Sequence, residues 1–115
     1  MNCRVTARHF DMTDATKNYA LEALDGLTRY FDRIVDCHII LEKEKDRWRA
    51  ECILGVYGKT LSADSREDLL YPAIDAAIDK MERQLEKYKA KISHEKDRRE
   101  MRQQNELPVD ESRSG

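Results

Sequence analysis

Polar and apolar positions near the start of the chain alternate with a period of two. Over residues 2–8, the small or apolar residues Cys3, Val5 and Ala7 are each followed by a polar one. This alternation is typical of a strand with one buried side. The first element is therefore expected to be a strand over residues 2–8.

The same period returns after residue 34. Residues 35–43 and 48–56 both alternate, and the segment between them is too charged to be buried, so the two segments predict a hairpin. Gly58 can supply the next turn. Residues 59–64 are then expected to form a short fourth strand.

Two segments have the period of 3.6 residues that is typical of a helix. Residues 14–31 carry apolar residues at this spacing, and Thr13 before them is the expected N-cap. A longer second helix is expected to open within residues 65–68. Pro72 then falls in its first turns, where a missing backbone N–H is tolerated. The predicted element order is β-α-β-β-β-α, which makes the fold class α+β.

The second predicted helix separates its residues into stripes when they are placed about 100° apart. One stripe is apolar and is expected to face the core; it contains Ile74, Ala77, Ile78, Met81, Leu85, Tyr88 and Ile92. A second stripe is acidic. The third is cationic or polar, and it contains Lys80, Arg83, Gln84, Lys87, Lys91, Arg98 and Arg102.

Charge is distributed unevenly along the chain. The net charge is −2, yet residues 80–102 hold nine Lys or Arg against five Asp or Glu, while residues 1–79 hold 11 against 15. A helix that is merely solvated forms weak i,i+4 ion pairs. Like charges kept side by side instead favour a polyanionic partner, because each neutralised phosphate releases counterions. The residues alone leave both interpretations open.

Motifs for catalysis or metal binding are not apparent. The three histidines lie far apart, and there is no metal-ligand spacing and no phosphate-binding loop. We expect no enzymatic activity, no metal, no cofactor and no small-molecule substrate. Cys3, Cys37 and Cys52 show no paired spacing, which argues against a disulfide framework and favours a reducing cytosol. Short apolar stretches and an N-terminus without a signal-peptide pattern predict neither export nor a membrane segment.

Three segments of the chain are distinctive: ARHFDMTDA at 7–15, LTRYFDRI at 27–34 and YPAIDAAIDKMERQLEKYKAK at 71–91. Together they resemble the ribosome hibernation promoting factor and protein Y family of ribosome-associated translation inhibitors, in its short form. The resemblance implies a four-stranded sheet with two helices packed on one face, similar to double-stranded RNA-binding domains. It also implies binding to the small ribosomal subunit and its 16S-type rRNA, in the mRNA and tRNA decoding channel. There the protein would reversibly inhibit translation and store ribosomes in stressed or stationary-phase cells.

The same resemblance points to rRNA-binding residues, none of them catalytic. The basic helix of the family falls on Lys80, Arg83, Lys87 and Lys91, with Gln84 and Lys89 as neighbours. Further candidates lie outside this helix; they are Arg8 at the end of the first strand and Lys17 and Arg29 on the first helix.

Two parts of the chain are expected from this comparison. Residues 1–95 would form the ribosome-binding domain, and residues 96–115 a charged helix extension that passes into a disordered tail from about residue 103. No dedicated dimerisation domain is expected. The alternative function is that of a stand-alone double-stranded RNA-binding protein, because such domains share the topology and read the shape of a duplex.

Overall fold

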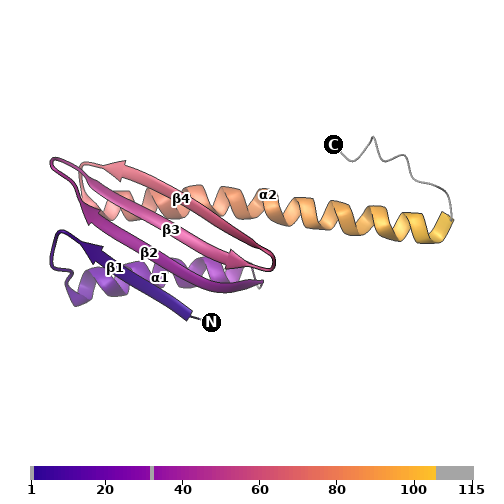
Figure 1. Ribbon diagram of the computed structural model, residues 1–115, viewed down its shortest axis with the longest axis horizontal. Coiled ribbons are helices and arrows are strands. Elements are labelled where there is room, and N and C mark those ends of the chain that lie inside the picture. Colours follow the sequence, from indigo (N-terminus) through magenta and orange to yellow (C-terminus); the bar gives the residue numbers. More distant parts are fainter. Residues whose placement is uncertain (1, 32, 106–115) are drawn as a thin grey trace. The chain divides into compact units, whose positions relative to one another are not determined.

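The described part of the chain forms four strands and two helices in this computed structural model (Figure 1). They are β1 (Asn2–Arg8), α1 (Asp14–Tyr30), β2 (Ile34–Lys43), β3 (Trp48–Val56), β4 (Lys59–Glu67) and α2 (Leu70–Asn105). The structure describes the backbone of residues 2–31 and 33–105 and the side chains of residues 3–31 and 33–91. The α+β class and the predicted element order are confirmed.

The four strands form one mixed sheet in the order β1-β2-β3-β4. β1 and β2 are parallel, as expected for strands connected through a helix, whereas β2, β3 and β4 are joined antiparallel by hairpins. Gly58 lies in the turn before β4 with φ of 72°, a left-handed conformation that glycine adopts without steric cost. The sheet therefore has two edges, β1 and β4.

β4 is longer than the sequence pattern predicted, and α2 begins later. Residues 65–68 were expected to open the helix, but Ser65 to Glu67 pair with β3 instead, and α2 starts at Leu70. Ser65 lies two positions after Ala63 and opposite Ala50, and only 7% of it is exposed. Ser65 is polar, which is typical of the start of a helix. In the structure the β3–β4 hairpin continues through Ser65, and its side chain joins the inward-facing row of β4. Pro72 does lie in the first turn of α2, as predicted.

α1 begins where the capping pattern predicted. The Thr13 hydroxyl accepts a hydrogen bond from the Thr16 backbone N–H at 3.1 Å, which confirms Thr13 as the N-cap. The helix ends at Tyr30, and the Phe31 N–H still donates to the Leu27 carbonyl at 3.0 Å. Its buried side is made by Thr16, Ala20, Leu24 and Leu27.

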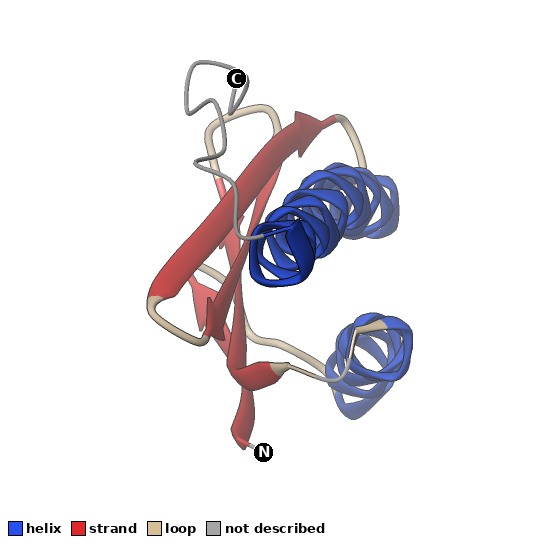
Figure 2. Cartoon of the chain, turned by 90° about the vertical axis from the view of Figure 1, so that its right-hand side faces the viewer, coloured by secondary structure: helices blue, strands red, loops and turns tan. Residues whose placement is uncertain are grey.

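The core lies between one face of the sheet and the two helices. Figure 2 shows that α1 and α2 lie on the same side of the sheet, which confirms the predicted layer arrangement. Inward-facing sheet residues such as Ile39, Cys52 and Leu54 are fully buried. α2 contributes Ala73, Ile74, Ala77, Met81 and Leu85, all of them 0% exposed, and this confirms most of the predicted apolar stripe. Ile78 and Tyr88 are half-buried.

Two compact units divide the chain, Met1–Leu85 and Glu86–Gly115. The first contains the sheet, α1 and the buried part of α2. The helix continues to Asn105, past residue 103 where the tail was expected, and the rest of that tail lies outside the described residues. The division into residues 1–95 and 96–115 stays a prediction. Neither α1 nor the described length of α2 is both long and apolar enough to cross a membrane.

One prediction about the cysteines is wrong. Cys3 and Cys37 form a disulfide, with their Cα atoms 4.6 Å apart. They are 34 residues apart in sequence, so their spacing gave no signal, but the parallel register of β1 and β2 places them directly opposite each other. Cys52 is a free, buried cysteine, and burial raises the pKa of its thiol to about 12. It therefore packs as a small apolar residue.

Candidate nucleic-acid interface

The exposed side of α2 carries the residues to which the sequence assigned rRNA binding. Lys80 and Arg83 are exposed and lie beside the buried row of Met81 and Leu85. This arrangement follows from helical geometry, because residues one and two positions from a buried residue point away from the core. Arg83 can therefore reach a partner without disturbing the packing, whereas Lys80 also has a contact within the protein.

Lys80 and Gln84 also hold α2 to the edge of the sheet. The Lys80 ammonium donates a hydrogen bond to the Asp64 carbonyl at 2.8 Å, and the Gln84 amide donates to the Ser62 carbonyl at 2.6 Å. Both carbonyls belong to β4, the edge strand. Unpaired edge groups otherwise invite pairing with another chain, so the two side chains protect this edge. Both residues are thus already engaged within the protein.

Arg83 forms an ion pair with Asp79, one turn earlier, at 3.0 Å. Their side chains are 71% and 55% exposed, and an exposed pair of this kind contributes little to stability. The acidic and cationic stripes of the helix are therefore joined at this point. A phosphate can replace Asp79 as the partner of Arg83 at small energetic cost.

Lys87, Lys89 and Lys91 lie on the part of α2 that belongs to the second unit, and all three are exposed. Lysine is a flexible point charge that suits contacts to a phosphate backbone. The side chains of Lys87 and Lys91 are available to a polyanion approaching that part of the helix.

The remaining predicted residues do not gather at one place. Arg8 is exposed at the end of β1, and Lys17 and Arg29 are exposed near opposite ends of α1. Arg29 pairs with Asp25 one turn earlier at 2.9 Å. Lys17 and Arg29 are therefore about 18 Å apart along α1, and Arg8 lies on a different element, β1.

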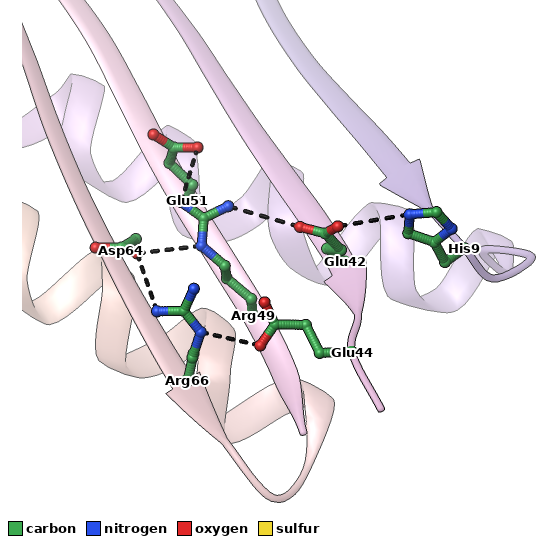
Figure 3. Close-up of polar contacts among 7 residues, drawn as sticks. All are labelled: His9, Glu42, Glu44, Arg49, Glu51, Asp64 and Arg66. Atoms are coloured by element: carbon green, nitrogen blue, oxygen red, sulfur yellow. Dashed lines mark hydrogen bonds and ion pairs between the residues drawn. The ribbon is translucent and has the colours of Figure 1, made fainter. Parts of the chain in front are cut away.

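The outer face of the sheet, opposite the helices, carries an ion-pair network that the sequence analysis missed (Figure 3). Arg49 lies at its centre, with ion pairs to Glu42 at 3.7 Å, Glu51 at 3.3 Å and Asp64 at 3.1 Å. Burial by itself lowers the pKa of Arg49, but the hydrogen bond with Asp64 and the charge of Glu51 outweigh it and raise the pKa. The side chain is only 18% exposed. Arg49 therefore acts as a structural cation.

Three further residues complete this network. Arg66 donates to Glu44 at 2.9 Å and approaches Asp64 at 3.8 Å. His9 lies 3.6 Å from Glu42. The period-two pattern places Arg49 and its three acids on one face of the predicted strands. It did not indicate Arg66, which was expected in the second helix, or Glu44 and His9, which lie outside the predicted strands. It also could not indicate which acid pairs with which arginine.

Polar and aromatic contacts also join the two helices. Tyr19 and Tyr71 stack with their ring centroids 4.3 Å apart, and the Tyr19 hydroxyl donates to the Asp75 carboxylate at 2.5 Å. This hydrogen bond, together with burial and the Asp75 charge, raises the pKa of Tyr19. Thr16 and Tyr71 share a further hydrogen bond at 3.3 Å. The start of α2 is thus tied to α1, while Lys80 and Gln84 tie it to β4.

Metal binding and nucleophilic chemistry find little support among the described side chains. They contain no group of three or more His, Cys, Asp or Glu residues that could hold a metal ion. Cys52 is buried and protonated at neutral pH, so it is a poor nucleophile. The chemistry available at the exposed side of α2 is electrostatic attraction and hydrogen-bond donation.

The chain belongs to the Sigma 54 modulation protein / S30EA ribosomal protein family, whose model matches residues 3–93. It is similar to the ribosome hibernation promoting factor of Azotobacter vinelandii, with 34% identity over 110 residues that cover 96% of each chain. Among solved structures it is similar to a ribosomal subunit interface protein from Coxiella burnetii, with a TM-score of 0.73, 28% identity and coverage of 78% of this chain and 99% of that one. The N-terminal domain of Thermus thermophilus Protein Y has a TM-score of 0.70 and 29% identity, and the match covers 76% of this chain and 99% of that domain.

Proposed function

We propose that this protein is a ribosome hibernation factor that binds the small ribosomal subunit in its mRNA and tRNA decoding channel and reversibly inhibits translation. The observation that carries the proposal is the family match over residues 3–93, which includes the strands, α1 and all the exposed cations that the structure describes on α2. The bound group is 16S-type rRNA, and the site of action is the cytoplasm, where ribosomes translate. The protein works by occupying space, without catalysis or a cofactor.

Cations on α2 supply the main contact in this proposal. Arg83, Lys87 and Lys91 are exposed, and each can replace solvent or a weak surface ion pair by an rRNA phosphate. Every phosphate neutralised in this way releases counterions, so the affinity should fall steeply as salt rises. The acidic stripe of α2 is repelled by phosphate, and binding is therefore oriented.

Binding is tested by charge reversal. The triple variant Arg83→Glu/Lys87→Glu/Lys91→Glu leaves Lys80 in place, because Lys80 also holds α2 to β4. The matched control is Arg33→Glu/Lys45→Glu/Arg47→Glu, which makes the same change in net charge at exposed residues beside the ends of β2. Both are measured by co-sedimentation with purified small subunits over a range of salt. The α2 variant should lose binding by at least 100-fold, and the control by less than tenfold.

Two results would contradict the α2 contact. Equal losses in the two variants would mean that only net charge matters, and unchanged binding of the α2 variant would place the contact elsewhere. A generic RNA duplex, added as competitor, separates the alternative function. A stand-alone double-stranded RNA-binding protein would bind the duplex as well as it binds the subunit, whereas a channel-binding factor would prefer the subunit.

Inhibition is tested by order of addition. A protein lodged in the decoding channel and a bound mRNA–tRNA pair exclude each other, so prebound ligands must shift the equilibrium away from the protein. Added first to vacant ribosomes in a cell-free system, the protein should block initiation at near-stoichiometric amounts. Added after mRNA and initiator tRNA, it should act weakly. Inhibition that is equal in both orders would overturn the channel as the binding site.

A further inference from the structure

Two arginines on β1 differ from most other described arginines of the protein. Arg4 and Arg8 are exposed on the outer face of the sheet, with Thr6 between them on the same face. Among the described side chains, neither arginine forms an ion pair, whereas Arg29, Arg49, Arg66 and Arg83 all do. Along the strand Arg4 and Arg8 span about 13 Å. That distance allows them to contact separate phosphates of one nucleic-acid strand.

The side chain of His38, on the neighbouring strand, contacts Thr6, the residue that lies between the two arginines. The register pairs it with Arg4, and its Nε2 atom lies 2.7 Å from the Thr6 hydroxyl. Burial lowers the pKa of His38, and the charges of Arg4 and Arg8 lower it further, while Glu51 raises it. The imidazole is thus exposed to positive potential from both arginines.

Acidic side chains near β1 are engaged elsewhere. Glu42 lies opposite Arg8 in the register, but its carboxylate contacts Arg49 and His9 (Figure 3). Glu51 contacts Arg49. The next outer-face acid of β2 is Asp36, which lies opposite Asn2 and packs against Gly55, where a Cβ atom would collide with its carboxylate. Among the described side chains none of these acids forms an ion pair with Arg4 or Arg8, so both arginines are left without an acidic partner.

We infer that Arg4 and Arg8, together with Thr6 and His38, form a second RNA-backbone site that binds phosphodiester groups on the outer face of the sheet. Guanidinium groups suit this role because their planar donors match phosphate oxygens in pairs. The inference rests on the proposed function, which supplies rRNA as the ligand. A domain lodged in a channel is contacted from several sides, and β1 lies at the edge of the sheet opposite to the edge that α2 holds.

The chain offers a matched control for this site. Arg33 and Arg47 are also exposed and without an ion pair among the described side chains, but they lie outside the strands, in the segment before β2 and in the turn before β3. The variants Arg4→Gln/Arg8→Gln and Arg33→Gln/Arg47→Gln therefore each remove two positive charges, the first from β1 and the second from segments outside the strands. Each is first shown to have the thermal midpoint of the parent protein, and the affinity for purified small subunits is then measured between low and high salt.

We expect Arg4→Gln/Arg8→Gln to weaken binding at least tenfold at physiological salt. Loss of two phosphate contacts should also reduce the slope of log K against log salt by about 1.5. The control should change affinity by less than threefold and leave the slope unchanged. The conservative variant Arg4→Lys/Arg8→Lys should keep the slope and lose part of the affinity, because lysine retains the charge but not the paired donors.

Several outcomes would overturn the inference. Equal losses in the two Gln variants would show an effect of net charge alone, and unchanged binding of Arg4→Gln/Arg8→Gln would show that β1 faces solvent in the complex. Shifts of the His38 imidazole resonances on addition of inorganic phosphate, without any loss of subunit binding in the variant, would reduce the site to one for a free ion. If the α2 charge-reversal variant binds normally while Arg4→Gln/Arg8→Gln does not, the α2 contact fails and this site stands.

Discussion

The two edges of the sheet are held in different ways. At β1 the Cys3–Cys37 disulfide links the edge strand to β2, and Arg4 and Arg8 have no acidic partner among the described side chains. At β4 the edge is held by hydrogen bonds from Lys80 and Gln84 of α2, and Arg66 is occupied by Glu44 and Asp64. Polar side chains that hold an edge are not free for a ligand. The β1 edge is held by the disulfide and by backbone pairing with β2. Its polar side chains are therefore available to a ligand.

Reduction of the disulfide is expected to have the largest effect on stability. A covalent link across 34 residues restricts the unfolded chain, and the chain-entropy model assigns about 4 kcal/mol to a loop of this size. Dithiothreitol should therefore lower the free energy of unfolding in urea by about that amount. In the variant Cys3→Ser/Cys37→Ser the reductant should have no effect. Thiol titration of the unfolded oxidised protein should find Cys52 alone, and three reactive thiols per chain would show that the β1 edge is not covalently held.

Removal of the central arginine of the outer face is expected to have the next largest effect. In Arg49→Met, Glu42, Glu51 and Asp64 lose their shared cation, and unfolding should become easier by about 2 kcal/mol. Arg66→Met is the control, because its side chain is 49% exposed and its loss should cost less than about 1 kcal/mol. Urea denaturation measures both. Equal effects would mean that burial of Arg49 adds nothing to the network.

Loss of one edge contact at β4 is expected to have a smaller effect. Gln84→Ala removes the 2.6 Å hydrogen bond to the Ser62 carbonyl and should cost about 1 kcal/mol. Hydrogen exchange of β4 amides should accelerate. Because Gln84 carries no charge, the salt dependence of subunit binding should keep its slope.

Lys87→Met changes an exposed residue of α2. It should reduce the slope of the salt dependence of subunit binding and leave stability unchanged. A change of salt slope without a change of stability in Gln84→Ala would contradict its assignment as an edge contact, and an unchanged slope in Lys87→Met would contradict a phosphate contact at Lys87.

The smallest expected effect is a pH dependence at β1. Burial and the charges of Arg4 and Arg8 lower the pKa of His38 in the folded state below its ordinary value of 6.5. The unfolded chain then binds more protons than the folded chain as pH falls through that value, so the folded state loses stability toward acid. The thermal midpoint should fall between pH 7.5 and 5.5, and less so in His38→Gln. An identical fall in both proteins would assign the dependence to other groups.

Much of this architecture could be predicted from the sequence because it depends on local patterns. Alternation at Cys3, Val5 and Ala7 defined β1, and Thr13 defined the start of α1. The buried row of α2 followed from helical spacing, with Met81 and Leu85 among its members. Such patterns are local because the burial of each side chain depends on the period of its own element.

The prediction of the candidate site was less complete. The exposed cations of α2 could be identified, since they lie off the apolar row. That Lys80 and Gln84 also donate to carbonyls of β4 could not, because their partners Asp64 and Ser62 are 16 and 22 residues away. The end of β4 was misjudged for a similar reason, as the pairing of Ser65 with Ala50 outweighs the helix-start character of its own segment.

The sequence by itself determined the order of the elements, the buried side of each and the concentration of positive charge on α2, because periodicity and charge are properties of neighbouring residues. Only the tertiary structure decided which distant residues meet. The parallel register of β1 and β2 places Cys3 opposite Cys37. The antiparallel register of β2 and β3 places Glu42 opposite Arg49, with which it forms an ion pair instead of pairing with Arg8. These contacts depend on how the strands pair within the sheet. The alternation of residues along a single strand does not indicate that pairing.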